Sequence, residues 1–159
     1  MTSVVSVIDR AVARLQSGAH VLDLVIRLYV ANVFFRSGLL KVANWDGTLY
    51  LFENEYHVPL LSPEVAAYVG TSAEILFPAL LALGAATRFA ALSLSVFNVI
   101  AVISFWHVLA TNEAALMSHF YWGLLLAVTL FHGPGKLSLD KWIWKRFKNR
   151  PLGTATREA

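Results

Sequence analysis

The stretch AAYVGTSAEILFPALLALG, residues 66–84, decides how the rest of the chain can be arranged. Apart from the carboxylate of Glu74, its side chains are apolar or small. As a helix rising about 1.5 Å per residue, the stretch is about as long as the core of a lipid bilayer is thick. Because an ionised carboxylate in lipid is costly, Glu74 must either face a protein interior with a partner or be neutral.

The composition is that of an integral membrane protein. The 159 residues are 57% hydrophobic and 14% charged, and the mean hydropathy is +0.60. The apolar residues fall in long blocks, which is not the pattern of a soluble domain. There is no cysteine, which excludes disulfides, thiol catalysis and iron–sulfur ligation by this chain. The net charge of +3 does not indicate nucleic-acid binding, because Lys and Arg concentrate toward the two ends of the chain.

The apolar blocks predict an all-α fold, an integral membrane four-helix bundle within residues 19–135. The four spans are expected at about residues 20–41, 63–84, 88–109 and 114–131. Ser62 and Pro63 are typical of a helix start, and Gly84 is typical of a helix end.

Two further segments flank the predicted bundle. Residues 1–18 carry apolar side chains at helical spacing together with Arg10 and Arg14, which predicts an amphipathic helix on the membrane surface. A frayed terminus is the alternative. Residues 136–159 are rich in Lys and Arg and contain Trp142 and Trp144, a composition typical of a basic cytoplasmic tail at a membrane interface.

The connection at residues 42–62 is rich in aromatic side chains. These are Trp45, Tyr50, Phe52 and Tyr56. Trp and Tyr at this density indicate an outer aromatic loop, lying in the headgroup layer over the mouth of the bundle. Asp46 and Gly47 predict a cap for a short helix that begins near Thr48.

The distribution of charge predicts the orientation in the membrane. Residues 1–18, the turn from Gly84 to Arg88 and the C-terminal tail are basic, whereas the connections at 42–62 and 110–114 have acids and no Lys or Arg. The positive-inside rule then places both termini in the cytoplasm and the two acidic connections outside a multi-pass cytoplasmic (inner) membrane protein.

Polar side chains from all four spans fall in the outer half of the predicted bundle. They are Asn32, Arg36, Glu74, His107 and His119. We expect an ion pair between Arg36 and Glu74 in the bundle interior, which either relays protons or is only a structural staple. Arg27 lies nine residues before Arg36, about half a turn away around the helix, and we expect it to extend to the headgroups instead.

The two histidines near the outer boundary leave two interpretations open. His107 and His119 are expected at a similar depth on neighbouring helices, where they could coordinate a metal or a haem iron. His57 is either a third ligand or has no role in such a site. Histidines near helix ends more often lie at the level of the headgroups, and no close His-x-x-x-His spacing supports a metal site here.

Several short motifs together resemble a known family. They are Arg27 with FRSGLLK at residues 35–41, Glu74 followed by LALG at 81–84, Thr87 with Arg88, and GPGKLSLD at 133–140. In order and spacing they resemble the DoxX family of small four-span membrane proteins, over about residues 20–142. The resemblance implies a four-helix bundle in the cytoplasmic membrane, of a kind that is often linked to oxidoreductase systems. Some relatives are similar to subunits of thiosulfate:quinone oxidoreductases, and others are associated with oxidative-stress complexes or metal handling.

The polar cluster and the resemblance together predict a membrane subunit of a quinone-linked redox system. In this interpretation Glu74 and Arg36 form the proton relay, and the chain is an oxidoreductase subunit without a catalytic motif of its own. The candidate residues for a quinone pocket are Asn32, Trp45, Tyr56 and Trp122. A haem or a metal is the weaker alternative to quinone as the cofactor. The expected partners are membrane lipid, a redox partner protein and further copies of the chain.

Two other classes of function remain open. The chain could be a non-catalytic membrane anchor or scaffold that recruits a cytoplasmic partner through its basic tail and amphipathic N-terminal segment. It could also be a small transporter or metal-handling protein, which would require His107 and His119 to be in contact.

Overall fold

The fold is all-α, as the apolar blocks predict. A computed structural model describes residues 2–148, apart from the side chains of residues 2–4, 11 and 13–17, and the described residues form no strand. The helices are α1 (Thr2–Ala43), α2 (Trp45–Asn54), α3 (Pro63–Leu83), α4 (Thr87–Ser104), α5 (Trp106–Leu109), α6 (Glu113–His132) and α7 (Leu139–Lys148). Four helical segments are long and apolar enough to cross a membrane: Gly18–Ala43, Pro63–Leu83, Thr87–Ser104 and Glu113–His132. The predicted integral membrane four-helix class is therefore confirmed.

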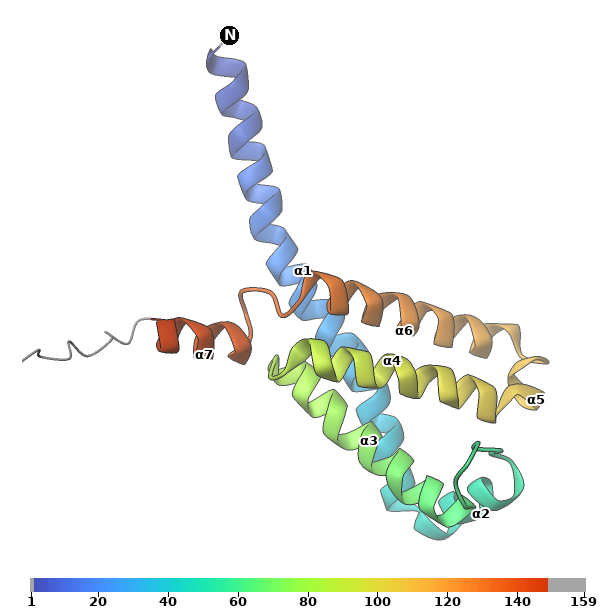
Figure 1. Cartoon of the computed structure of the whole chain (residues 1–159). Helices are drawn as coiled ribbons and strands as arrows, with labels where there is room; N and C mark the ends of the chain where they lie inside the picture. The colour runs from blue at the N-terminus through green and yellow to red at the C-terminus, as the bar shows by residue number, and fades with distance from the viewer. Residues whose placement is uncertain (1, 149–159) are drawn as a thin grey trace, which may run out of the picture.

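The four spans pack as a bundle whose core lies between α1, α3, α4 and α6. Helix α1 packs mainly against α3, and α4 packs mainly against α6 (Figure 1). The buried core contains Val30, Ala31, Phe34, Leu81, Ala90, Ala91, Leu94 and Leu126. Phe34 lies at its centre, with the rings of Phe97 and Trp122 edge-on at 6.2 and 5.9 Å. Burial of these side chains holds the spans together where they face each other.

The third apolar block forms two helices, whereas the sequence predicted one helix to residue 109. Helix α4 ends at Ser104, and the short α5 begins at Trp106. The connection after α2 explains the break, since the N–H of His57 donates to the Ser104 carbonyl at 2.9 Å and the ring of Tyr56 packs on Phe105 at 4.8 Å. His107 consequently lies on α5, outside the span.

The helix ends follow the predicted signals in part. Gly84 ends α3 in the left-handed conformation, with φ of 69°, as predicted. Ser62 occupies the N-cap position of α3, but its side chain makes no capping hydrogen bond. The predicted start of α2 was wrong, because Asn44, not Asp46, caps that helix by accepting from the N–H of Gly47 at 3.2 Å.

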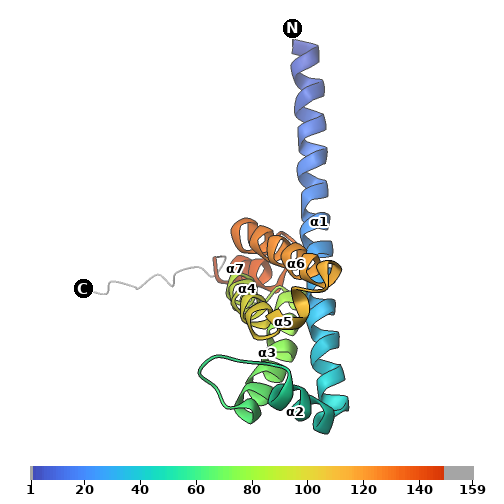
Figure 2. The same ribbon diagram turned by 90° about the vertical axis from the view of Figure 1, so that its right-hand side faces the viewer.

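The N-terminal part of α1 and helix α7 lie on the same side of the bundle. Helix α1 continues without interruption from Thr2 to Ala43, and its N-terminal part extends beyond the other helices (Figures 1 and 2). A position of residues 2–18 on the membrane surface stays a prediction. Residues 139–148 of the predicted basic tail form α7, whereas residues 149–159 lie outside the described part.

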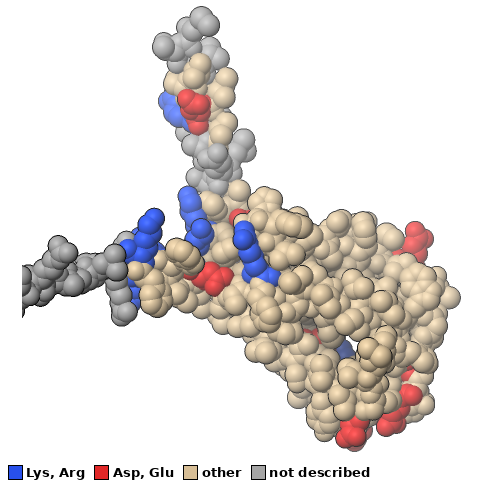
Figure 3. Space-filling model, in the orientation of Figure 1, with Lys and Arg blue, Asp and Glu red and all other residues tan. Residues whose placement is uncertain are grey.

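Charged side chains divide the molecule into two ends. Lys and Arg gather toward the end with the α3–α4 turn and α7, here called the basic end (Figure 3). Asp and Glu lie mainly toward the opposite end, which carries α2 and α5 and is here called the acidic end.

Candidate functional site

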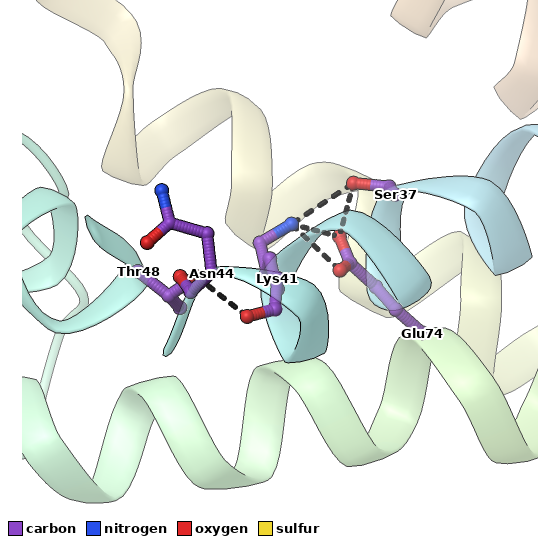
Figure 4. A network of polar contacts seen from close by, with 5 residues as sticks. All are labelled: Ser37, Lys41, Asn44, Thr48 and Glu74. Atoms are coloured by element: carbon purple, nitrogen blue, oxygen red, sulfur yellow. Dashed lines mark hydrogen bonds and ion pairs between the residues drawn. The ribbon is translucent and has the colours of Figure 1, made fainter. Parts of the chain in front are cut away.

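Glu74 lies between α1 and α3, toward the acidic end, and it has a partner. Its side chain is only 7% exposed, and the ammonium group of Lys41 on α1 lies 2.8 and 2.6 Å from the two carboxylate oxygens (Figure 4). The hydroxyl of Ser37 donates to Oε1 at 3.2 Å and accepts a hydrogen bond from Lys41 at 2.9 Å. A carboxylate, an ammonium group and a hydroxyl thus form one connected cluster between two spans.

The local sequence of α1 explains why this cluster can form. Ser37 and Lys41 are four residues apart and share a face of the helix. Gly38 lies on the same side, where a Cβ atom would come within 2.9 Å of Ile75 and 3.0 Å of the Glu74 Cβ. Only a glycine allows α1 and α3 to approach this closely, so Gly38 brings the carboxylate to Ser37 and Lys41.

The predicted ion pair between Arg36 and Glu74 was wrong, and Lys41 takes the place of Arg36. Arg36 is exposed on the outside of the bundle, and within the described residues it makes no ion pair or hydrogen bond. The reason lies in the helix period, because the inward face of α1 runs through Arg27, Ala31 and Phe34 to Gly38. Arg36 lies half a turn away from that face.

Arg27 is buried, and the expectation that it extends to the headgroups was wrong. It is 1% exposed, and its guanidinium group donates to the carbonyl of Leu81 at 3.3 Å and to the carbonyl of Leu137. Its Nε is buried without a hydrogen-bond partner in the described part of the chain. The guanidinium group therefore joins α1 to the end of α3 and to the segment before α7.

Asp140 attaches the C-terminal segment to the α3–α4 turn. Its carboxylate accepts from the N–H of Ala86 at 2.8 Å and from the N–H and hydroxyl of Thr87 at 2.9 and 2.7 Å. Its own N–H donates to the carbonyl of Gly84 at 2.9 Å. Burial alone would raise the pKa of Asp140, but the hydrogen bonds from Thr87 and Ala86 and the charge of Arg27 together lower it. Asp140 thus serves as the N-terminal cap that α4 itself lacks.

The four residues predicted for a quinone pocket do not line one cavity. Asn32 is exposed and lines a groove between α1 and α3, whereas Trp122 packs in the core against Phe34. Tyr56 lies between the rings of Phe52 and Phe105, at 4.9 and 4.8 Å. Burial, the charge of Glu74 and the charge of Glu55 raise the pKa of the Tyr56 phenol, in that order.

Trp45, the fourth of these residues, lines a cavity close to the Glu74 cluster. The cavity has a volume of about 410 Å³ and lies between the end of α1, the start of α2 and α3. The rings of Trp45 and Tyr68 pack at 4.6 Å along its wall. Thr71 also lines it, and the Thr71 hydroxyl is buried without a hydrogen-bond partner among the described residues. Thr71 precedes Glu74 by three residues, so both lie on the same side of α3.

The two histidines of the predicted metal site have separate partners. The Nε2 atom of His107 lies 3.3 Å from the carboxylate of Glu55, and its ring lies 5.5 Å from that of His57. The Nδ1 atom of His119 lies 2.8 Å from the amide oxygen of Asn98, which joins α4 to α6. Residues 2–148, as far as their side chains are described, contain no group of three or more His, Cys, Asp or Glu that could hold a metal ion. These contacts give the metal prediction no support.

Sequence reasoning missed Ser37, Lys41, Gly38 and Asp140. The signal for the first three was the spacing from Phe34 through Gly38 to Lys41, which follows the apolar face of α1 and could have been preferred to Arg36. Asp140 had no comparable signal, because its partners lie 53 and 54 residues away in the chain.

Comparison with known proteins assigns the chain to a family. The DoxX family model matches residues 22–107. A protein of Haemophilus influenzae, described only as an uncharacterized protein, is 33% identical over 141 residues, which cover 84% of this chain and 90% of that protein. No solved structure matches the chain. The chain is therefore similar over most of its length to an uncharacterized bacterial protein, and it belongs to the DoxX family.

Proposed function

We propose that the chain is the membrane subunit of a quinone-linked redox system, in which the Lys41–Glu74 pair transfers protons. The observation that carries the proposal is the Ser37–Lys41–Glu74 cluster between two spans, beside a cavity with aromatic walls. A buried carboxylate in hydrogen-bond contact with an amine can take up or release a proton without moving a charge far. Ionisable side chains inside membrane spans are rare, are usually paired and commonly mark a functional site.

The cavity beside the cluster fits an aromatic ring with a carbonyl group. Its volume of about 410 Å³ falls within the usual range for small-molecule sites. Trp45 and Tyr68 would hold the ring by stacking, and the unpartnered hydroxyl of Thr71 would donate a hydrogen bond to its carbonyl. A bound quinone supplies chemistry in which two electrons and two protons are exchanged. Glu74 and Lys41 hold and pass the protons, while the electrons come from or go to a redox partner protein.

The distribution of charge supports a cytoplasmic membrane location with the basic end inside. Figure 3 shows Lys and Arg mainly at that end and Asp and Glu mainly at the opposite end. With the positive-inside rule, the described parts of both chain ends lie on the cytoplasmic side, and the cavity beside Trp45 opens in the outer half.

The quinone site is tested by titrating the purified protein with a short-chain ubiquinone and following tryptophan fluorescence. We expect saturable quenching, and we expect Thr71→Val to weaken the affinity about fivefold to tenfold, because one hydrogen bond is lost. Thr129→Val is the matched control, since the Thr129 hydroxyl is already bonded within its own helix to Leu125 at 3.0 Å. Equal affinities of the two variants, or quenching that does not saturate, would reject the site.

The proton role is tested by infrared difference spectroscopy of the reconstituted protein as bound quinone is chemically reduced. We expect a carboxyl band that disappears in Glu74→Gln and persists in Glu113→Gln, which changes an acid at the start of α6. An unchanged spectrum in Glu74→Gln would show that Glu74 is only a structural staple.

A second function, that of a membrane anchor or scaffold, is favoured by α7. This helix buries no side chain in the bundle and exposes Trp142, Trp144 and Phe147 beside several Lys and Arg residues. As a scaffold, the chain would keep its partner when Glu74→Gln is introduced and would lose it when α7 is altered.

A further inference from the structure

The outer face of α1 carries two strongly polar side chains within the membrane span. Asn32 and Arg36 are four residues apart, both are exposed, and neither makes a hydrogen bond or ion pair within the described residues. They lie 11 and 7 residues before the end of α1 at Ala43, or about 16 and 10 Å along the helix axis. Arg36 can bend toward the outer headgroups, but the short amide of Asn32 cannot reach water from this depth.

A groove is lined in part by Asn32, about one helical turn from Arg36. It runs between α1 and α3, has a volume of about 410 Å³ and is almost entirely apolar apart from Asn32. Ala31, Ala79 and Ala82 form part of its wall, and Pro78 lies in the same wall. Small residues of this kind let another transmembrane helix approach the backbone closely. A polar stripe beside an apolar groove is the arrangement expected of a helix-binding surface.

A second copy of the chain does not fit this surface. Two copies in the same orientation, related by an axis along the membrane normal, would bring Arg36 of one against Arg36 of the other. A carboxylate would be needed between them, but Glu74 is already paired with Lys41. The other described acids lie toward the ends of the spans, in residues 45–62, in the extended part of α1 or in α7. Like charges at the same depth therefore oppose self-association through this face.

We infer that the groove binds a transmembrane helix of a different membrane protein, and that this helix carries a carboxylate at the depth of Arg36. The guanidinium group would pair with that carboxylate, and the amide of Asn32 would bond to a polar group about one turn deeper. The inference rests on the proposed function only in treating the chain as a subunit. It does not involve Thr71, Glu74 or the cavity beside Trp45.

The test uses the full-length chain in lipid vesicles and a synthetic leucine-rich transmembrane helix as the probe. The probe carries one Glu, Leu or Lys at the depth of Arg36. Association is measured by energy transfer from the labelled probe to an acceptor label on a single cysteine introduced at Leu40. Leu40 is 72% exposed and lies on α1, as Arg36 does. The native chain has no cysteine, so the label is unique.

We expect the Glu probe to bind about fivefold to tenfold more tightly than the Leu probe, and the Lys probe to bind more weakly than either. Arg36→Gln should remove the preference for Glu. Arg88→Gln, which changes an exposed arginine near the start of α4, should keep it. Equal binding of the Glu and Leu probes, or a preference that survives Arg36→Gln, overturns the inference.

A second measurement tests whether a second copy of the chain binds this groove. Leu28 lines the groove, and Leu28→Cys places a thiol where a second copy would have to pack. We expect no disulfide-linked dimer under mild oxidation, and efficient formation of one would assign the surface to self-association. Because quinone binding is measured separately through Thr71→Val, failure here leaves the proposed function standing, and failure there leaves this surface standing.

Discussion

Gly38 sets the distance between α1 and α3, and through that distance it sets the geometry around Glu74. A methyl group at Gly38 would lie 2.9 Å from the Ile75 side chain and 3.1 Å from the Glu74 backbone carbon. Gly38→Ala must therefore push the two helices apart or distort them, which typically costs about 1–3 kcal/mol. Thermal unfolding in mild detergent should show a lower midpoint for this variant.

Gly123→Ala provides the comparison for Gly38→Ala. Gly123 is also inside a span, but its added Cβ would meet only the Asn98 amide nitrogen, at 3.5 Å. Both substitutions add the same methyl group to a helix. The difference between their unfolding midpoints therefore reports the effect of the close approach between α1 and α3. A midpoint for Gly38→Ala equal to that of Gly123→Ala would mean that α1 and α3 separate at little cost.

The Lys41–Glu74 pair predicts strong coupling between two substitutions. Lys41→Met leaves a buried carboxylate without its cation, and breaking a buried pair in this way costs about 3–5 kcal/mol. Adding Glu74→Gln should recover a large part of the loss, because the unpaired charge is removed. Arg36→Gln should change the unfolding midpoint little, since Arg36 has no partner in the described residues. Additive losses for the Lys41 and Glu74 substitutions would contradict the pairing.

At the scale of the helices, α4 depends on a residue from outside itself. Its N-cap position is Ala86, which has no side chain that can cap, and Asp140 supplies the missing acceptor. Asp140→Ala should cost about 0.5–2 kcal/mol, as the loss of an N-cap usually does. Hydrogen exchange should then show faster exchange at the Ala86 and Thr87 amides, whereas Asp140→Asn should retain part of the protection. Unchanged exchange in Asp140→Ala would show that another group caps α4.

The same cap gives the attachment of α7 a pH dependence. The pKa of Asp140 is lower in the folded protein than in the unfolded chain, so its contribution to stability is present in full above the unfolded pKa. The contribution is lost as the pH falls through the lowered folded value. Protection of the Ala86 and Thr87 amides should therefore persist at neutral and mildly acidic pH and fall only in strong acid. In Asp140→Asn this dependence should be absent.

The helices themselves could largely be predicted from the sequence, whereas their contacts could not. Long apolar blocks predict spans because a backbone in hydrocarbon must satisfy its own hydrogen bonds, which a helix does. Gly84 also ends α3 where predicted. The break at Phe105 could not be predicted, because it depends on a hydrogen bond from His57 to the carbonyl of Ser104, 47 residues later in the chain. Apolarity places a residue in the membrane but does not show which face of the helix is inward.

The choice of ion-pair partner shows the same limit. Arg36 and Lys41 both lie near the end of α1 at Ala43, and depth alone favoured Arg36. The inward face of α1 is instead determined by packing of Ala31 and Phe34 against α3, α4 and α6. Two arginines half a turn apart cannot both face inward, and burial of Arg27 leaves Arg36 outside.

At the scale of the whole molecule, separation of charge between the two ends predicts the orientation. A cysteine in place of Asn54 at the acidic end should react with a membrane-impermeant maleimide in intact spheroplasts. A cysteine in place of Lys136 at the basic end should react only after lysis, because the positive-inside rule places it in the cytoplasm. The absence of native cysteine makes each label unambiguous. The opposite pattern would invert the assigned orientation.

The contact between Arg27 and the segment before α7 has a consequence for the time course of synthesis. Arg27 is in the first span, but one of its acceptors, the Leu137 carbonyl, follows 110 residues later. At about 5–20 residues per second, translation of this interval takes roughly 5 to 20 seconds. During that interval the nascent first span carries a guanidinium group that is only partly satisfied. The hydrogen bonds of Arg27 are therefore completed only after Leu137 has been synthesised, and a chain cut short before Leu137 would leave part of this buried guanidinium group without an acceptor.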